Sequence, residues 1–353
     1  MSKNFKCCLI VLCFVALTLF AGCNFIPSNK KEYTVSFDSN GGTTVESRTV
    51  EENATTYKPR NPEKTGYVFD AWYYDDQRWN FYTQRITKDI TLVAKWHLLP
   101  SDGIAYLLND DYTAYYVGDY LGSATDVVIS DTYRGLPVTE IGSWAFSSTD
   151  VRSVRLPNTI TRIRDCAFPS CHWLSDINFP ASLLEIDAGA FQNCDRLTTV
   201  VIPKSVKKIG SSNFIRCSWL TKIEVESGNA FYDSRNNCNA IIETQTNTLI
   251  AGCKNSEIPN NVAIIGDGAF EGKGLHKMVE IPKSVKEIGN LAFASNSFLA
   301  IIIPNSVTKM GSLVFDDCLN LTIYCEASSR PKGWSTSWNN DHNQVVWNYV
   351  KNN

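Results

Sequence analysis

Cysteine and histidine are the residues of this sequence best suited to nucleophilic or metal chemistry. The chain holds 12 cysteines and four histidines, the latter at His97, His172, His276 and His342. No two histidines have the close spacing that zinc-binding motifs use. Cys171 and His172 are adjacent, and neighbouring residues of a strand point to opposite faces, so they do not form a nucleophile–base pair. These residues therefore predict neither an enzyme, nor a metal site, nor a bound cofactor.

Four cysteines follow a repeating pattern that a structural role explains. Each lies three residues after a phenylalanine, at Cys171, Cys194, Cys217 and Cys318. Lys273 and Asn296 occupy the same place in two further repeats, so the position does not require a thiol. Because free cysteine is a small residue that is commonly buried, we predict that these side chains form a buried column.

Cys238 and Cys253 differ from these four, because both lie in a segment that interrupts the repeats. Residues 238–253 look like two strands joined by a polar turn. If the strands pair with Ile242 opposite Leu249 and the register holds, Cys238 faces Cys253 and a disulfide between them is possible. A register change of one residue removes that pairing, so both the bonded and the free state stay open.

The N-terminus looks like an export signal. Two lysines precede an apolar run at residues 7–19, shorter than the ~20 residues that span a bilayer, so a signal peptide is predicted over residues 1–22. The run ends in Leu19-Phe20-Ala21-Gly22-Cys23, which resembles the lipobox of bacterial lipoproteins. The resemblance implies acylation of Cys23, a tether at residues 23–32 and a location on the outer face of a bacterial membrane. Ordinary signal cleavage, with Cys23 incidental, is the alternative.

Composition narrows the class of partner. The chain has 353 residues, of which 44% are hydrophobic and 20% charged, as is usual for folded domains. Its net charge of −3 provides no basic excess, so nucleic acid is not an expected partner. We expect contact with the membrane only through the lipid anchor.

Residues 33–97 form a β-rich unit of their own. Apolar and polar residues alternate from Tyr33 to Phe37, and the turn Asn40-Gly41-Gly42 follows. The stretches 35–42, 66–73 and 89–96 resemble the Listeria–Bacteroides (internalin B-repeat) module. The resemblance implies a small β-grasp-like fold that serves as a spacer or as an accessory binding unit.

From about residue 136 onward the sequence repeats itself. Phenylalanines recur at steps of 22, 23, 23, 56, 23 and 22 residues, at Phe146, Phe168, Phe191, Phe214, Phe270, Phe293 and Phe315. A period near 23 falls within the range of about 20–29 residues that leucine-rich repeats have. The step of 56 is one period plus 33 residues, which predicts a hairpin insertion near residues 227–258. One repeat cannot bury its apolar residues alone, so stacked copies should form a solenoid.

The residue pattern of the repeat carries a family resemblance. Ala-Phe-x-x-Cys-x-x-Leu followed by Ile-Pro-x-Ser-Val-x-x-Ile-Gly is similar to the BspA-like leucine-rich-repeat family over residues 103–353. The resemblance implies an N-terminal cap at residues 103–135, repeats at residues 136–325 and a C-terminal cap at residues 326–353. We therefore expect a mainly β protein, in which a leucine-rich-repeat solenoid follows a small β-grasp-like module.

One row of residues beside the predicted strands is a candidate for ligand binding. Counted back from the repeat prolines, the row holds Trp173, Arg196, Trp219, Leu275 and, with one residue deleted, Phe298. Strand positions that alternate with core residues should also face outward, and they include Arg155, Asn178, Val201, Glu224, Met278 and Glu280. The alternative is structural, since an aromatic row can wedge strand edges together.

The sequence thus predicts a cell-surface binding protein. The family resemblance implies adhesion to a host, matrix or microbial protein, with polysaccharide as another possible partner. The alternatives are a glycan-binding accessory protein, for which an aromatic row is suited, and a passive surface spacer. The ligand itself cannot be named, because specificity rests on a few surface side chains of a generic repeat.

Overall fold

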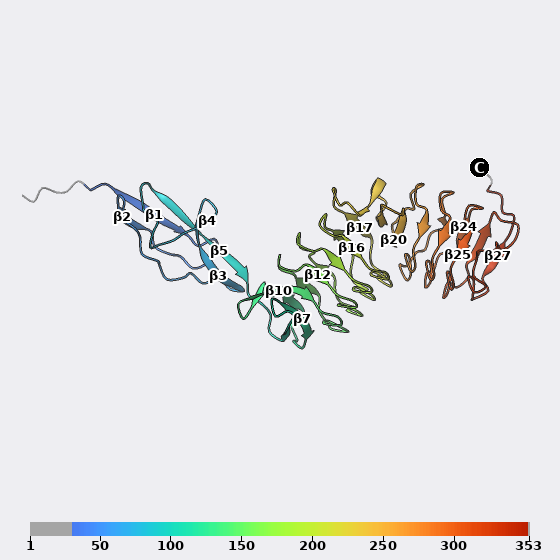
Figure 1. Ribbon diagram of the computed structural model, residues 1–353, viewed down its shortest axis with the longest axis horizontal. Coiled ribbons are helices and arrows are strands. Elements are labelled where there is room, and N and C mark those ends of the chain that lie inside the picture. Colours follow the sequence, from blue (N-terminus) through green and yellow to red (C-terminus); the bar gives the residue numbers. More distant parts are fainter. Residues whose placement is uncertain (1–29, 352–353) are drawn as a thin grey trace, which may run out of the picture. The chain divides into compact units, whose positions relative to one another are not determined.

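The computed structural model describes residues 30–351, and contacts divide the chain into two units between His97 and Leu98 (Figure 1). The predicted signal peptide, the lipidation site Cys23 and most of the predicted tether lie outside the described residues.

The N-terminal unit is a five-stranded sheet in the order β2–β1–β5–β3–β4. Its strands are β1 Glu32–Asp38, β2 Arg48–Glu51, β3 Tyr67–Tyr74, β4 Gln77–Arg78 and β5 Ile90–Leu98. The alternating apolar residues of β1 and β5 share one face, with Val35 opposite Ile90 and Phe37 opposite Leu92, and these side chains are buried around Trp72. The central strands β1 and β5 run parallel, yet no helix crosses the sheet among residues 30–97, so the β-grasp-like fold stays a prediction.

The second unit is a β-solenoid, as the period of about 23 residues predicts. Most repeats contribute two short strands, and strands of successive repeats pair in parallel. One ladder comprises β10 Leu136–Ile141, β12 Arg162–Ile163, β14 Glu185–Ile186 and β16 Lys208–Ile209. The other ladder begins with β8 Asp126–Val128, β11 Ser153–Arg155 and β13 Asp176–Ile177, and β15 Thr199–Ile202 and β17 Lys222–Val225 follow as a separate pair.

The repeat phenylalanines form the spine of the core. All seven are at most 2% exposed, which confirms their predicted burial. Their rings stack from repeat to repeat, with centroids 4.7 Å apart for Phe146 and Phe168 and 5.3 Å apart for Phe168 and Phe191. Burial of such aromatic side chains removes a large apolar area from water and dominates the stability of a core.

The column of cysteines runs beside the phenylalanines and is buried, as predicted. Each member donates a hydrogen bond to the main-chain carbonyl of the phenylalanine one repeat earlier. The distance is 2.9 Å from Cys171 Sγ to Phe146 O and 2.8 Å from Asn296 Nδ2 to Phe270 O. Cys194, Cys217, Cys318 and Lys273 make the same bond. The position therefore requires a buried donor that satisfies a buried carbonyl, which explains why lysine and asparagine can replace the thiol.

The insertion between the fourth and fifth phenylalanine is a three-stranded antiparallel meander, β18 Tyr232–Asp233, β19 Ala240–Glu243 and β20 Thr248–Gly252. The 3-10 turn η1 Arg235–Asn237 joins its first two strands. Strand β20 then pairs in parallel with β21 Ile264–Ile265, so the insertion ends by rejoining a ladder of the solenoid.

The possible disulfide between Cys238 and Cys253 is not formed, and both thiols are free. The hairpin does place Ile242 opposite Leu249, but Ile241 lies opposite Ala251, so Ile250 forms a bulge. A bulge shifts the register by one residue. That shift moves Cys238 out of line with Cys253, and Cys253 donates instead to Asn239 O at 3.4 Å.

The two ends of the solenoid are covered. At the start, the antiparallel pair β6 Ile104–Leu108 and β7 Tyr115–Tyr120 precedes β10, and β9 Thr132–Tyr133 pairs with β10. Tyr120 stacks on Phe146 with ring centroids 5.3 Å apart. At the other end, one ladder consists of β22 Val279–Glu280, β24 Ala300–Ile303, β26 Thr322–Cys325 and β27 Gln344–Val346. A second ladder continues from β21 through β23 Glu287–Ile288 to β25 Lys309–Met310. Trp338 packs edge-on against Phe315, which keeps the last ring of the spine from water.

Candidate ligand-binding surface

Trp173, Arg196 and Trp219 form a stack on the surface of the solenoid. Each lies two residues after a member of the buried cysteine column, so three successive repeats present the three side chains in one register. The Arg196 guanidinium carbon is 5.2 Å from the Trp173 ring centroid and 4.4 Å from the Trp219 ring centroid. Trp173 and Trp219 are 48% and 53% exposed. The row is thus a half-exposed cation–π sandwich, which we call the Trp–Arg–Trp stack, and these three side chains are not part of the core.

The stack is an ordered surface rather than three free side chains. A cation over an indole face gains about 0.5–1 kcal/mol at an exposed site. The main chain beneath is also fixed, since Trp219 N donates to Asp195 O at 3.3 Å. An arginine that is already held between two rings loses little conformational freedom when a partner binds, which favours affinity.

A polar pair borders the stack and offers no catalytic nucleophile. His172 Nδ1 lies 2.7 Å from Asp195 Oδ2 on the exposed side, whereas Cys171 points inward to Phe146 O. The two side chains thus face opposite ways, but they lie in a turn and not in the predicted strand. Burial raises the pKa of the Cys171 thiol to about 11, so the thiolate is scarce at neutral pH.

A cleft of about 400 Å³ is lined by residues that follow Trp173 and Arg196 in the same repeats, where the ladder of strands is interrupted. Strand β13 pairs only with β11, and β15 pairs only with β17, so the edges of β13 and β15 are not joined. Polar groups and partly exposed apolar groups line the opening: Ser175, Asp176, Ile177, Asn178, Phe179, Thr198, Thr199, Val201, Pro203 and Glu226. We call it the β13–β15 cleft. Two of the predicted binding residues, Asn178 and Val201, lie in it.

Several of the other predicted binding residues are occupied by contacts within the chain. Arg155 forms an ion pair with Asp176, and Glu224 pairs with Lys222 at 2.8 Å. The Asn178 side chain both accepts from Leu156 N and donates to Leu156 O, at 2.8 and 2.9 Å. The contacts of Arg155 and Asn178 join neighbouring repeats, whereas Glu224 pairs within its own strand β17, so only part of each side chain remains free for a partner.

The assignment of Phe298 to the exposed row is wrong, because this ring is fully buried. The repeat at Phe293 lacks one residue, and the deletion precedes Phe298. Phe298 lies six residues before Pro304, as the buried Leu197 lies six residues before Pro203. Its ring packs against that of Phe293, with ring centroids 6.1 Å apart. Leu275 is buried as well, at 7% exposure, so the exposed row ends at Trp219.

Met278 and Glu280 lie on a different cleft from the stack. This opening, of about 570 Å³, lies between residues 254–258 of the insertion and residues 275–280. Met278 is 54% exposed, while Glu280 pairs with Lys351 at 2.6 Å. The structure thus separates the predicted row into two surfaces on either side of the insertion.

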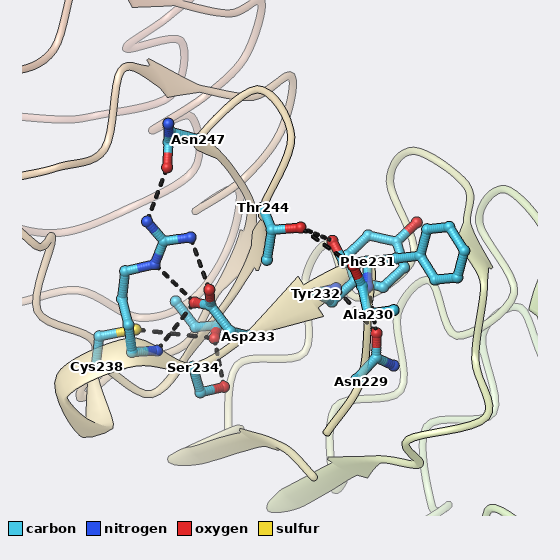
Figure 2. Close-up of polar contacts among 11 residues, drawn as sticks. Asn229, Ala230, Phe231, Tyr232, Asp233, Ser234, Cys238, Thr244 and Asn247 are labelled. Carbon is cyan, nitrogen blue, oxygen red and sulfur yellow. Dashed lines mark hydrogen bonds and ion pairs between the residues drawn. The ribbon is translucent and has the colours of Figure 1, made fainter. Parts of the chain in front are cut away.

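Sequence reasoning missed Phe231, an exposed aromatic residue of the insertion. Its side chain is 45% exposed, yet its main chain is held: Phe231 N donates to Asn229 Oδ1 at 2.8 Å, and Thr244 Oγ1 donates to Phe231 O at 3.0 Å (Figure 2). Nearby, Arg235 donates to both carboxylate oxygens of Asp233, each at 2.7 Å, and this bidentate ion pair stabilises the same meander. The insertion has no counterpart in the other repeats, so the repeat pattern gives no register from which to predict this residue.

Within residues 30–351 no group of three or more histidine, cysteine or acidic side chains is arranged to hold a metal ion. In that same part of the chain, no helix has both the length and the apolar character needed to cross a membrane.

Comparisons with known proteins agree with these two units. A family model described as the BspA type leucine rich repeat region matches residues 139–248 and 241–328, and one described as the Listeria-Bacteroides repeat domain matches residues 33–95. A protein of Evansella cellulosilytica named putative Gly-rich membrane protein is 43% identical over 70 residues, or 19% of this chain; the match spans only 8% of that relative.

Solved structures of leucine-rich-repeat proteins are also similar. The T. pallidum leucine rich repeat protein TpLRR is 26% identical, with 63% of this chain and 90% of that one covered and a TM-score of 0.41. A leucine-rich repeat protein from Eubacterium ventriosum is 24% identical, with 66% and 73% covered and a TM-score of 0.48.

Proposed function

The chain belongs to the family of BspA-type leucine-rich-repeat proteins, and we propose that it binds a protein partner through the Trp–Arg–Trp stack and the adjoining β13–β15 cleft. The observation that carries this proposal is the stack itself, three half-exposed or exposed side chains held in contact on successive repeats. Protein–protein hot spots are enriched in tryptophan, tyrosine and arginine. No other set of residues that we predicted from the sequence combines these types with such fixed geometry.

The features around the stack suit a peptide or protein surface. The β13–β15 cleft offers a mixture of carboxylate, amide and hydroxyl groups beside the apolar surface of Val201, which is 40% exposed. The outward strand positions carry charges of both signs among uncharged residues, so electrostatic steering should be modest and salt should weaken binding only slightly.

The cellular role that we propose is adhesion from the bacterial surface. Support comes from the lipobox-like sequence that ends at Cys23 and from the family to which the repeats belong. In this scheme the protein is exported, acylated at Cys23 and tethered to the outer face of a membrane, and the solenoid recognises a host, matrix or microbial protein.

Two alternatives fit the surface less well. A sugar that stacks on Trp173 and Trp219 must compete with Arg196, which already covers a face of each ring. A passive spacer gives no reason for two half-exposed indole rings and a guanidinium held in contact, since contiguous exposed apolar surface is a usual mark of an interaction site.

The test is a binding screen of the purified protein, lacking only residues 1–23, against immobilised matrix proteins and polysaccharides. Saturable binding to a protein, abolished in the double variant Trp173→Ala, Trp219→Ala, supports the proposal. The matched control is Trp144→Ala, which removes another exposed tryptophan of the solenoid, 59% exposed and outside the stack. Binding that persists in a folded double variant, or binding to polysaccharide alone, contradicts it.

A further inference from the structure

The N-terminal unit contains a cleft that the proposed function does not use. It measures about 360 Å³ and is lined by residues of β3 and β4, by the residues that follow β4, and by Lys58. Its lining combines aromatic rings with charged and amide groups: Lys58, Asp70, Ala71, Trp72, Arg78, Trp79, Asn80, Phe81 and Tyr82. A concave site with aromatic walls and a few polar groups is the usual form of a small-ligand site.

Two of its aromatic residues have hydrogen-bond donors without acceptors. The indole N–H groups of Trp72 and Trp79 are buried and make no hydrogen bond, although both residues belong to the wall of the cleft. Trp72 is only 1% exposed. Nearly all buried polar groups in folded proteins find a partner, so two adjacent exceptions in one wall point to a missing acceptor.

The rim of the cleft offers an exposed aromatic platform, the ring of Tyr82. Tyr82 is 88% exposed, although its main chain is fixed because Tyr82 N donates to Asn80 Oδ1 at 2.9 Å. Trp79 is held against Tyr74, with ring centroids 6.2 Å apart. Exposed aromatic rings in fixed positions can stack on the C–H face of a sugar ring, while the free Nδ2 of Asn80 can donate to a hydroxyl group.

The charge of the cleft favours an acidic ligand. Asp70 already accepts from Tyr73 at 2.7 Å and lies 3.9 Å from Arg78 and 3.7 Å from His97. Lys58 has no ion-pair partner among residues 30–351, so the lining keeps one uncompensated positive charge. A carboxylate on the ligand would complete this arrangement through a charge-assisted hydrogen bond.

We propose that this cleft binds a saccharide that carries carboxylates, such as a chain of uronic acids. The sugar ring stacks on Tyr82 and Trp79, its carboxylate meets Lys58 and Arg78, and its oxygens accept from the indole N–H groups. Those N–H groups become accessible through a rotamer change of the rim, a common adjustment on binding. The site is separate from the Trp–Arg–Trp stack, so its ligand is independent of the protein partner.

The experiment is calorimetric titration of the purified protein, lacking only residues 1–23, with hexasaccharides. Two probes are acidic, from polygalacturonate and hyaluronan, and one is neutral, from galactan. We expect at least one acidic probe to bind and the neutral probe to bind at least about tenfold more weakly. Binding of neither acidic probe, or equal binding of the neutral one, overturns the proposal.

Three variants then locate the site. Tyr82→Ala and Lys58→Glu should each weaken binding at least about tenfold, because they remove the platform and reverse the charge. Trp79→Phe keeps an aromatic ring but removes the unpaired N–H, so it should weaken binding without lowering Tm. The control is Tyr57→Ala, which alters a tyrosine of the same unit that is 72% exposed and stacks on Arg48 outside the cleft. Unchanged affinity in Tyr82→Ala and Lys58→Glu, or an equal loss in Tyr57→Ala, places the binding elsewhere and contradicts the assignment.

Discussion

The guanidinium carbon of Arg196 lies 4.4 Å from the ring centroid of Trp219, the residue that occupies the same position one repeat later. This contact shows how a repeat protein turns an internal register into a surface. The buried cysteine column fixes the distance between successive repeats. The residue type two positions after each cysteine then determines which side chain is exposed on the surface. Arginine between two tryptophans is the most distinctive product of that register in this chain.

Arg196→Met should therefore affect binding far more than folding. The methionine fills part of the space between the two rings but removes the cation. We expect the free energy of unfolding to fall by no more than about 2 kcal/mol, the scale of two exposed cation–π contacts. Binding of the protein partner should weaken at least about tenfold, because arginine is among the usual hot-spot residues. Urea denaturation and a surface binding assay measure the two effects, and a variant that loses stability while keeping its affinity would show that the stack is structural.

Phe191→Ala should be strongly destabilising. Its ring is fully buried between Phe168 and Phe214, with centroids 5.3 and 5.6 Å away. Truncation of a buried aromatic residue costs about 3–5 kcal/mol, through lost burial and the cavity left behind. The control Leu299→Ala removes a side chain that is 64% exposed and should cost less than about 1 kcal/mol. Equal losses in the two variants, measured by chemical denaturation, would refute the stacked spine.

Much of this fold follows from the sequence, and the reasons for the exceptions are local. The steps between phenylalanines predict the spine because stacked copies must share one register, and the Trp–Arg–Trp stack follows from the same count. The prediction for Phe298 was wrong because its repeat lacks one residue. Aligned on Phe293, Phe298 matches the exposed Arg196, whereas aligned on Pro304 it matches the buried Leu197. Only the packing of the core decides between the two alignments. The bulge at Ile250 and the break between β13 and β15 depend on strand pairing, which neither composition nor period encodes.

The thiols should react in a characteristic order. Seven of the eight cysteines of the described chain are buried, and burial raises the pKa of the Cys318 thiol to about 11 and that of Cys325 to about 12. In the protein that lacks residues 1–23, a thiol reagent at pH 8 should rapidly modify only the partly exposed Cys166. Denaturation without a reductant should then expose the other seven thiols, for a total of eight. A count of six would mean that one disulfide forms, with Cys238 and Cys253 as the first pair to examine.

Cys23→Ser tests the proposed anchor. If Cys23 is the acylated residue, serine should leave the protein uncleaved or release it into the medium, because two or more acyl chains are needed for stable attachment. Detergent-phase partitioning of the expressing cells shows which fraction holds the protein. The control is Cys166→Ser, which changes a cysteine far from the lipobox-like sequence and should leave partitioning as it was. If Cys23→Ser is cleaved and still partitions like the unaltered protein, the anchor is not at this residue.

Lys273 should make stability rise with pH in the alkaline range. This side chain is fully buried and replaces cysteine in the donor column, and burial lowers the pKa of its ammonium from the ordinary 10.5. The nearby Glu271 offsets this only in part, because Arg216 also contacts that carboxylate, at 3.1 Å. Between the lowered pKa and 10.5 the unfolded chain binds more protons than the folded chain, so the free energy of unfolding increases as pH rises through that window.

The matched variant for this effect is Lys273→Asn, since Asn296 already fills the equivalent position and donates to the equivalent carbonyl. Asparagine does not titrate, and the buried thiols act equally in both proteins, so urea denaturation from pH 7 to pH 10.5 should show the free energy of unfolding of the unaltered protein gaining on that of the variant. As pH approaches 10.5, the free energy of unfolding of the unaltered protein should increase relative to that of the variant. The reason is that the folded chain then holds Lys273 uncharged and no longer has to bury a charge. Parallel curves would mean that Lys273 keeps an ordinary pKa in the folded chain and that its ammonium reaches water.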